Sequence, residues 1–136
     1  MIAIDTNILV YAFDTSYPEK REKCKKIIQD IFDGKQEGAL TNQILAEFTN
    51  VVLKKIEKPL TKSQVKIIIG AITSCENYKI YNYNQDTLLK SLNLNSTFWD
   101  ALIIQTLKDA NVHKIITENT KDFIDKDIEV ENPFNN

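Results

Sequence analysis

Apolar and polar positions are arranged along this chain in blocks that predict strands followed by helices. The first four residues form a short apolar run, Asp5 follows it, and a helical spacing of apolar residues begins at Ile8. This order predicts a strand that carries one carboxylate to the start of a helix. Functional residues often lie at such strand ends because the rigid sheet holds the connecting loop in place.

Further along the chain, apolar residues recur at helical spacing between start and stop signals. Pro18 and Gly34 are typical of the two ends of one helix, and Thr61 with Gln64 predicts a capping box for another. The expected helices cover residues 18–34, 42–58, 61–75, 88–92 and 97–110. Shorter apolar runs predict further strands at residues 39–40, 78–83, 114–117 and 128–130.

Strands that alternate with helices predict a parallel sheet that is covered on both faces. We therefore expect an α/β fold, a three-layer α/β/α arrangement around a central parallel sheet, formed by one domain over residues 1–136. In such sheets ligands bind beyond the carboxyl ends of the strands. Asp5 and residues 117–119 are both expected at such ends.

The composition fits an ordinary globular protein, with 43% hydrophobic and 26% charged residues. A net charge of −2 argues against a protein that coats nucleic acid through positive charge alone, although bound cations would still allow a nuclease. Cys24 and Cys75 fall on apolar helix faces and are expected to be buried thiols in a reducing compartment. No membrane span or signal peptide is evident, so we expect a cytoplasmic protein.

Glu47 stands at an unusual place in its predicted helix. It follows Ile44 by three residues and precedes Val51 by four, which places it on the apolar face. A carboxylate there is costly unless a positive group meets it. Glu47 either bends out to water at the edge of the stripe or belongs to a binding site.

Asp100 shows the same conflict, since it lies three residues before Ile103 on a face that is otherwise apolar. It also lies in the first turn of its helix, where an acid complements the helix dipole. Taken together, three inward carboxylates at Asp5, Glu47 and Asp100 would repel each other in a site of low dielectric constant. A divalent cation is the simplest way to relieve this repulsion.

A fourth segment follows the predicted strand at residues 114–117. It offers Glu118, Asn119 and Asp122, and spacing alone does not decide which of them faces the site or whether all three are ordinary loop residues. Clusters of carboxylate and amide oxygens without His or Cys suit Mg²⁺ or Mn²⁺. The single histidine, His113, opens a predicted strand and is expected to be structural, so no Ser–His–Asp arrangement is available.

With these residues in place, the chain resembles the PIN domain family. The resemblance rests on segments 5–14 (DTNILVYAFD), 98–103 (FWDALI) and 117–119 (TEN), with Glu47 between them, and extends to residues 131–134. PIN domains are Mg²⁺- or Mn²⁺-dependent nucleases that act mostly on RNA, and many are toxins of VapBC toxin–antitoxin pairs. The resemblance implies a ribonuclease whose products carry 5′-phosphate and 3′-hydroxyl ends.

The resemblance also implies roles for individual residues. Asp5, Glu47 and Asp100 would be the shared acidic ligands, and Thr6 or Asn7 would hold Asp5 in place. Where relatives often have Thr-Glu-Asp, this chain has Asn119, which puts a second metal site in doubt. Glu118 is our expected further ligand, with Asp122 as an alternative, unless one metal is enough.

Two other classes compete with this interpretation. A phosphotransferase of the haloacid-dehalogenase type also places an aspartate at the tip of its first strand, but it usually has a second aspartate two residues later, where this chain has Asn7. A non-catalytic nucleic-acid-binding PIN protein is the alternative on the same fold.

The expected partners follow from the resemblance as well: an RNA substrate, a small antitoxin that would block the acidic pocket with a basic side chain, and a second copy in a homodimer. Two basic runs are candidates for steering RNA, although such runs are often solvated helix faces. They are Lys20, Arg21, Lys23, Lys25 and Lys26 in one helix, and Lys54, Lys55 and Lys58 in another.

Overall fold

Five parallel strands form one sheet in the computed structural model of the chain, which describes residues 1–135. The spatial order of the strands is β3-β2-β1-β4-β5, so the first strand lies in the middle. The strands are β1 (Ile2–Ile4), β2 (Gly38–Thr41), β3 (Tyr78–Tyr81), β4 (Lys114–Ile116) and β5 (Glu129–Glu131). Every neighbouring pair is parallel.

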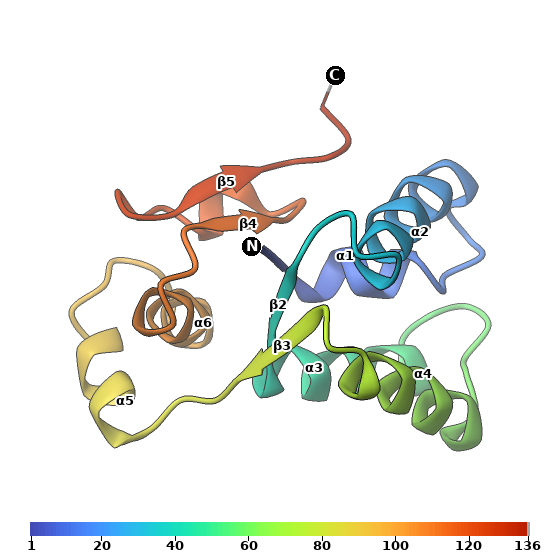
Figure 1. Cartoon of the computed structure of the whole chain (residues 1–136), viewed down its shortest axis with the longest axis horizontal. Coiled ribbons are helices and arrows are strands. Elements are labelled where there is room, and N and C mark those ends of the chain that lie inside the picture. The colour runs from blue at the N-terminus through green and yellow to red at the C-terminus, as the bar shows by residue number, and fades with distance from the viewer. Residues whose placement is uncertain (136) are drawn as a thin grey trace.

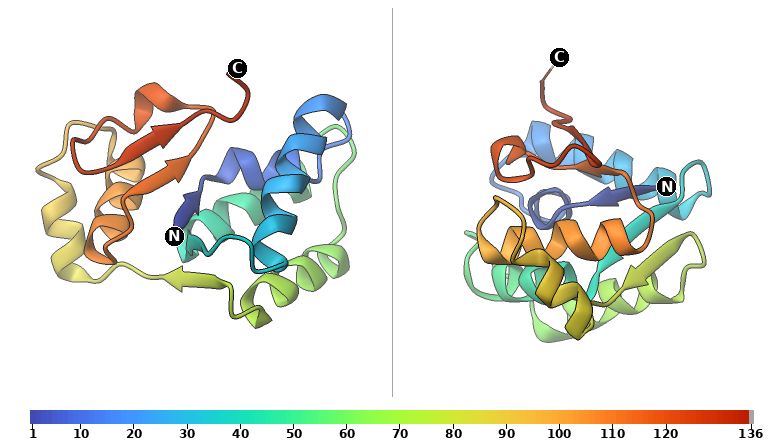
Figure 2. Two further views of the ribbon diagram at one scale, coloured as in Figure 1. Left: turned by 45° about the horizontal axis from the view of Figure 1, so that its top comes forward. Right: turned by 90° about the vertical axis from the view of Figure 1, so that its left-hand side faces the viewer.

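Within the described residues, six α-helices flank this sheet. They are α1 (Thr6–Tyr11), α2 (Pro18–Phe32), α3 (Asn42–Lys54), α4 (Lys62–Ser74), α5 (Gln85–Ser91) and α6 (Phe98–Asp109), and a 3₁₀ turn, η1, covers Thr120–Asp122. Figures 1 and 2 show α1 to α4 on one side of the sheet and α5 with α6 on the other. The predicted three-layer α/β/α fold is confirmed.

Local signals account for most helix starts. Thr41 caps α3 by accepting a hydrogen bond from the Ile44 N–H, and Thr61 forms the predicted capping box with Gln64 at the start of α4. α3 ends at Lys54, earlier than the predicted residue 58. The chain turns back there because the Leu60 N–H donates to the Val52 carbonyl (2.9 Å).

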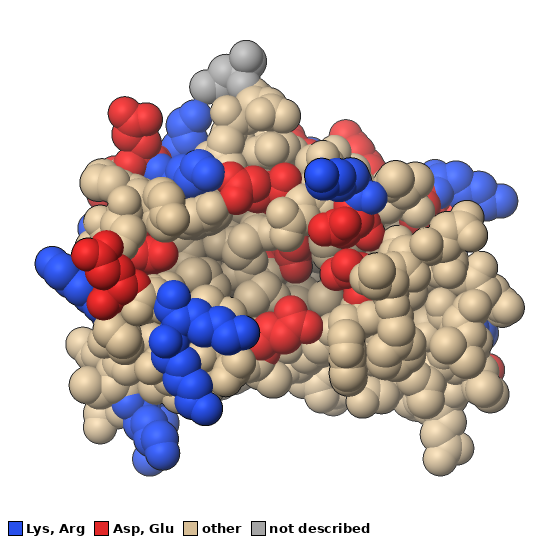
Figure 3. Space-filling model, turned by 180° about the vertical axis from the view of Figure 1, so that it is seen from behind, with Lys and Arg blue, Asp and Glu red and all other residues tan. Residues whose placement is uncertain are grey.

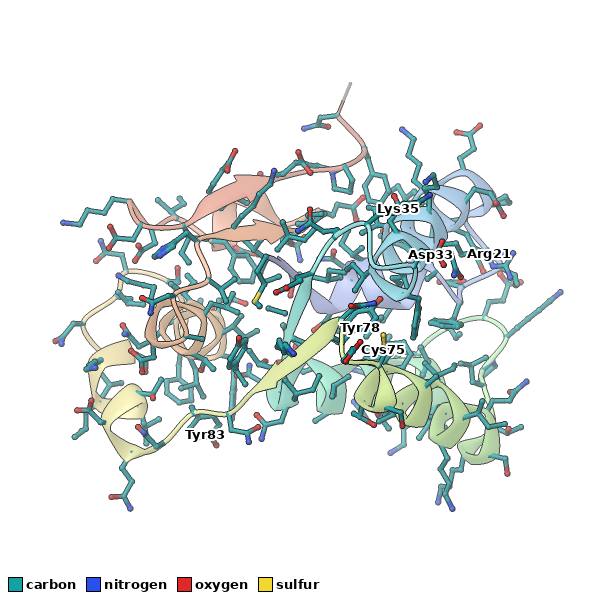
Figure 4. The ribbon with its side chains drawn as sticks, in the orientation of Figure 1. Arg21, Asp33, Lys35, Cys75, Tyr78 and Tyr83 are labelled. Atoms are coloured by element: carbon teal, nitrogen blue, oxygen red, sulfur yellow. The ribbon has the colours of Figure 1, made fainter. Side chains whose placement is uncertain are left out.

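The predicted strand at residues 78–83 is also shorter, since β3 ends at Tyr81. β3 is an edge strand, and the Tyr78 hydroxyl ties it to the neighbouring layer by donating to the Ile28 carbonyl of α2 (2.9 Å). Figure 4 shows Tyr78 and Cys75 together where α4 passes into β3. Both cysteines are free thiols, with Cys24 buried and Cys75 half-buried.

The middle of the sheet is fully buried. Ala3 and Ile4 in β1, and Ala39 and Leu40 in β2, have no exposed surface. Such continuous burial is typical of strands that are covered on both faces. Within residues 1–135, no helix is both long enough and apolar enough to cross a membrane.

The path of the chain places β1 and β4 at the point where strand order reverses. The chain moves outward from β1 to β3 and then crosses back to β4 on the other side of β1. The ends of these two strands are joined directly, because the Asp5 N–H donates to the Ile116 carbonyl (3.0 Å). This switch point is where ligand sites of open α/β sheets are found.

Candidate functional site

Asp5 is fixed at the switch point by three hydrogen bonds. Its Oδ1 accepts from the Thr6 N–H (2.8 Å), so Asp5 also caps α1. Its Oδ2 accepts from the Thr117 hydroxyl (2.7 Å) and from the Asn7 side-chain amide (3.2 Å). Asp5 is only 5% exposed, and these three partners are all neutral groups.

Glu47 reaches the same region from α3. Its Oε2 accepts from the Thr6 hydroxyl (3.1 Å), and its Oε1 accepts from the Gln43 amide (2.8 Å) one turn earlier. Thr6 therefore contacts Asp5 through its backbone and Glu47 through its side chain. The half-buried Glu47 does not simply bend out to water, which was one of the two sequence interpretations.

Asp100 comes from the first turn of α6, on the opposite side of the sheet from α3. Its Oδ2 accepts from the Thr97 hydroxyl (2.8 Å). Thr97 is the N-cap residue of α6 but makes no side-chain hydrogen bond to the helix backbone. Its hydroxyl orients Asp100 instead.

One pocket of about 390 Å³ is lined by Asp5, Glu47 and Asp100. Figure 3 shows acidic side chains gathered around a hollow in the middle of one face of the molecule. Further lining residues include a fourth carboxylate, that of the buried Asp14, together with Thr6, Asn7, Tyr11, Tyr17, Lys55 and Asn119. The structure thus brings together six of the candidate ligands and supporting residues of the sequence analysis, from four separate parts of the chain.

The burial and crowding of these acids change their ionisation. Burial, with smaller repulsion from Glu47 and Asp100, raises the pKa of Asp5 to about 6, although hydrogen bonds from Thr117 and Thr6 act in the opposite direction. The pKa of Asp100 is also raised, first by burial and then by the charges of Asp122 and Glu47. Both acids are therefore poised to gain from a bound cation.

Glu118 lies apart from this pocket. Its carboxylate forms an ion pair with Lys20 of α2 and accepts a hydrogen bond from the Tyr11 hydroxyl (2.6 Å). Partial burial acts to raise the pKa of Glu118, but the hydrogen bonds from Lys20 and Tyr11 outweigh it, and the pKa is lowered. The structure does not place Glu118 among the lining residues, where the sequence analysis expected a further metal ligand.

Asp122 is also outside the acidic pocket. It is exposed in η1 and lines a separate depression with Ser96 and Thr97. Asn119, by contrast, lines the acidic pocket, and its backbone N–H donates to the Thr117 hydroxyl (3.0 Å). Of the three residues left open by the spacing, only Asn119 therefore faces the acids.

The donor set fits Mg²⁺ or Mn²⁺ in kind, because it consists of carboxylate and amide oxygens. Within residues 1–135, no three Asp, Glu, His or Cys side chains converge closely enough to hold an ion without adjustment. Asp5 and Glu47 are linked through Thr6, whereas Asp100 approaches on a different helix.

Several lining residues were not expected from the sequence. Tyr11 and Tyr17 form a wall of the pocket, with ring centroids 5.5 Å apart in an edge-to-face arrangement. Lys55 lies at the pocket, and only the basic run at residues 54–58 had drawn attention to it. Lys20 belonged to the other basic run, but in the structure it forms an ion pair with Glu118.

A family model described as PIN domain matches residues 1–121, which is most of the chain. The chain therefore belongs to the PIN domain family, and the predicted resemblance is confirmed. Among curated proteins, no sequence matches this chain.

Solved structures share the fold over nearly the whole chain. FitAB bound to an IR36 DNA fragment has a TM-score of 0.66 at 18% identity and covers 99% of this chain and 96% of its own. VapC20 of Mycobacterium tuberculosis, described as a sarcin–ricin loop cleaving toxin, has a TM-score of 0.63 at 11% identity, with coverage of 85% and 87%. VapBC2 of Rickettsia felis, bound to a promoter DNA fragment, has a TM-score of 0.61 at 21% identity, with coverage of 97% and 98%.

Proposed function

We propose that this chain is a divalent-metal-dependent endoribonuclease that hydrolyses phosphodiester bonds of RNA. The observation that carries the proposal is the meeting of Asp5, Glu47 and Asp100, from three separate elements, at one pocket. Asp5 is buried with neutral partners and two like-charged neighbours, which is unfavourable until a cation is bound. Membership of the PIN domain family supports the same chemistry.

Each residue has a defined part in this proposal. Asp5, Glu47 and Asp100 hold Mg²⁺ or Mn²⁺, which when bound lowers the pKa of an attacking water and neutralises charge on the phosphate. Thr117 and Asn7 keep Asp5 in position, and Lys55 attracts the RNA backbone to the pocket. Glu118 is left out of the ligand set because Lys20 already neutralises it.

The experiment is cleavage of labelled single-stranded and structured RNA in Mg²⁺, Mn²⁺ or EDTA. Wild type is compared with Asp5→Asn and with Asp33→Asn, which makes the same change on an exposed residue just beyond α2 (Figure 4). We expect metal-dependent cutting by wild type and Asp33→Asn, and cutting at least about 100-fold slower by Asp5→Asn. Equal cutting by all three proteins would mean a contaminating nuclease.

The same experiment distinguishes the alternative function. If folded wild-type protein binds metal and RNA but cuts no substrate, the chain is a non-catalytic nucleic-acid-binding PIN protein. Asn119, at the place where relatives often carry an acid, is the feature that favours this outcome.

We further propose that the chain is the toxin of a VapBC-type pair and is inhibited by a small antitoxin. The fold is shared with VapC20, which is described as a toxin, and with the FitAB and VapBC2 structures, and the acidic pocket is open to a basic side chain. Expression in a bacterial host should stop growth for wild type and not for Asp5→Asn. Normal growth with abundant, active wild-type protein would contradict the toxin proposal and leave the nuclease intact.

A further inference from the structure

A second depression adjoins the acidic pocket and shares Glu47 with it. α3 forms one side through Gln43, Ala46 and Asn50, and Trp99 at the start of α6 forms the other. The depression has a volume of about 440 Å³. Because Glu47 lines both hollows, the two lie next to each other.

Trp99 is held in place while its indole remains in solvent. The Gln43 amide donates to the Trp99 carbonyl (3.1 Å), and the Phe98 ring meets the indole edge-to-face with centroids 4.9 Å apart. The residue is nevertheless 60% exposed. A large aromatic side chain that is both fixed and exposed is suited to a flat partner, because little conformational freedom is lost on stacking.

The polar groups around Trp99 suit the edge of such a partner. Asn50 is exposed and carries both a donor and an acceptor in its amide. Single-stranded nucleic acid is recognised by this combination, since every base has a π-face for stacking and an edge for hydrogen bonds. A base in a duplex has both features occupied by its neighbours.

We propose that the depression between Trp99 and α3 is a subsite for one unpaired nucleobase beside the scissile phosphate. Trp99 stacks on the base and Asn50 hydrogen-bonds to its edge. The inference rests on the proposed nuclease function and deepens it, because it names the residues of this chain that contact the base next to the scissile phosphate. Double-stranded RNA is then excluded at the subsite.

The chain contains its own reporter for this test, because Trp99 is the only tryptophan in the sequence. Binding is measured with a fluorescein-labelled single-stranded RNA and with the same RNA annealed to its complement. Ca²⁺ replaces Mg²⁺ during the titration, and a gel verifies that the RNA remains intact. Anisotropy gives the affinity, and on a parallel unlabelled titration the indole emission reports stacking.

The variants are Trp99→Ala, Trp99→Phe and, as a matched control, Tyr83→Ala. Tyr83 is 43% exposed and lies between β3 and α5, outside the lining of both depressions (Figure 4). We expect single-stranded RNA to quench Trp99 emission and Trp99→Ala to weaken its binding by about 5- to 150-fold. Trp99→Phe should recover most of this loss, and Tyr83→Ala should bind as wild type.

Three results would overturn the subsite. One is unchanged emission together with wild-type affinity of Trp99→Ala; if Asp5→Asn still abolishes cleavage, the nuclease stands and only the subsite fails. A second is equal loss of affinity for duplex and single-stranded RNA. A third is a change of Trp99 emission and of mass with protein concentration alone, which would make this face a contact between copies. If wild type cuts no RNA but the binding experiment gives the expected quenching and loss of affinity, the nuclease proposal fails and the base subsite stands.

Discussion

Two carboxylates at the ends of neighbouring strands have opposite surroundings. Asp5 follows β1 and is 5% exposed among neutral hydrogen-bond donors. Glu118 lies just after β4 and meets the ammonium group of Lys20. The pKa of Asp5 is raised, mainly by burial, while the pKa of Glu118 is lowered by Lys20 and Tyr11 despite its partial burial.

The difference comes from one side chain of α2. Lys20 Nζ lies 4.9 Å from the centre of the Tyr11 ring and 5.1 Å from that of Phe134. These two aromatic faces and the Glu118 carboxylate together fix the position of the ammonium group. Asp5 has no such partner among its hydrogen bonds. An acid that the protein leaves uncompensated is available to an external cation, whereas a compensated acid stabilises the fold.

Cleavage rates should separate the two acids most widely. We expect Asp5→Asn to lower the rate of RNA cleavage by about 100- to 1,000-fold, because charge stabilisation of the transition state is lost. Glu118→Gln should lower it by less than about fivefold, since a partly exposed ion pair contributes at most about 1 kcal/mol. Single-turnover assays give both values. Equal losses would show that Glu118 takes part in the chemistry.

The second-largest difference between Asp5 and Glu118 should appear in how the stability of the protein depends on pH. A carboxyl whose pKa is raised on folding binds its proton more tightly in the folded state, so its favourable contribution is present below about pH 4 and is lost as pH rises through about 6. The shift corresponds to about 2–3 kcal/mol. Urea unfolding in EDTA from pH 4 to 7 should show this loss for wild type relative to Asp5→Asn. A constant difference between the two proteins across that range would contradict the raised pKa.

In the same unfolding experiment, the contribution of Glu118 to stability should change with pH in the opposite direction. Its lowered pKa stabilises the folded state above the unfolded pKa of a glutamate, and that contribution is lost as pH falls. The difference between wild type and Glu118→Gln should therefore grow with rising pH.

Removing the Thr117 hydroxyl should have a smaller effect. Thr117→Val keeps the shape of a fully buried side chain but deletes the donor to Asp5 (2.7 Å). We expect a loss of about 1.5–3 kcal/mol at pH 7, where Asp5 is ionised, and less at pH 4.5. Thr106→Val is the matched control, since the buried Thr106 hydroxyl donates to a neutral backbone carbonyl (2.6 Å). Its cost should not change with pH.

The smallest effect is expected at Lys20. Lys20→Met should reduce stability by about 1 kcal/mol, because the pair with Glu118 is partly exposed and screened by salt. The pKa of Glu118 should then rise, which carboxyl chemical shifts in an NMR titration would detect. Lys26→Met removes the more exposed Lys26–Asp30 pair and should leave Glu118 unchanged. If the pKa of Glu118 is the same in Lys20→Met as in wild type, Lys20 is not the cause of the difference between Glu118 and Asp5.

The order of strands and helices was predictable because it depends on local patterns. The period of apolar residues and the caps at Thr41 and Thr61 act within a few positions of each helix end. The early end of α3 was not predictable, since it depends on the Leu60 N–H bonding back to Val52.

In the candidate site, too, local features were predictable from the sequence and long-range contacts were not. Glu47 and Asp100 had conflicted with the apolar face of their own helices and Asp5 stood at a strand end, and such features are visible in one sequence. Asp14 also lines the pocket but had no such signal. The pairing of Glu118 with Lys20 spans 98 positions and left no local trace, so spacing could not separate Glu118 from Asn119. The exposure of Trp99 likewise depends on the distance between α3 and α6.

The central place of β1 has a consequence for protein synthesis. β1 is made first, but the Thr117 hydroxyl that holds Asp5 is 112 positions away, and Asp100 arrives only with α6. A nascent chain that has not yet released β4 from the ribosome has an unpaired edge on β1 and no finished pocket. Contacts over such a separation also form slowly. The pocket can therefore catalyse a reaction only when translation of the domain is almost complete.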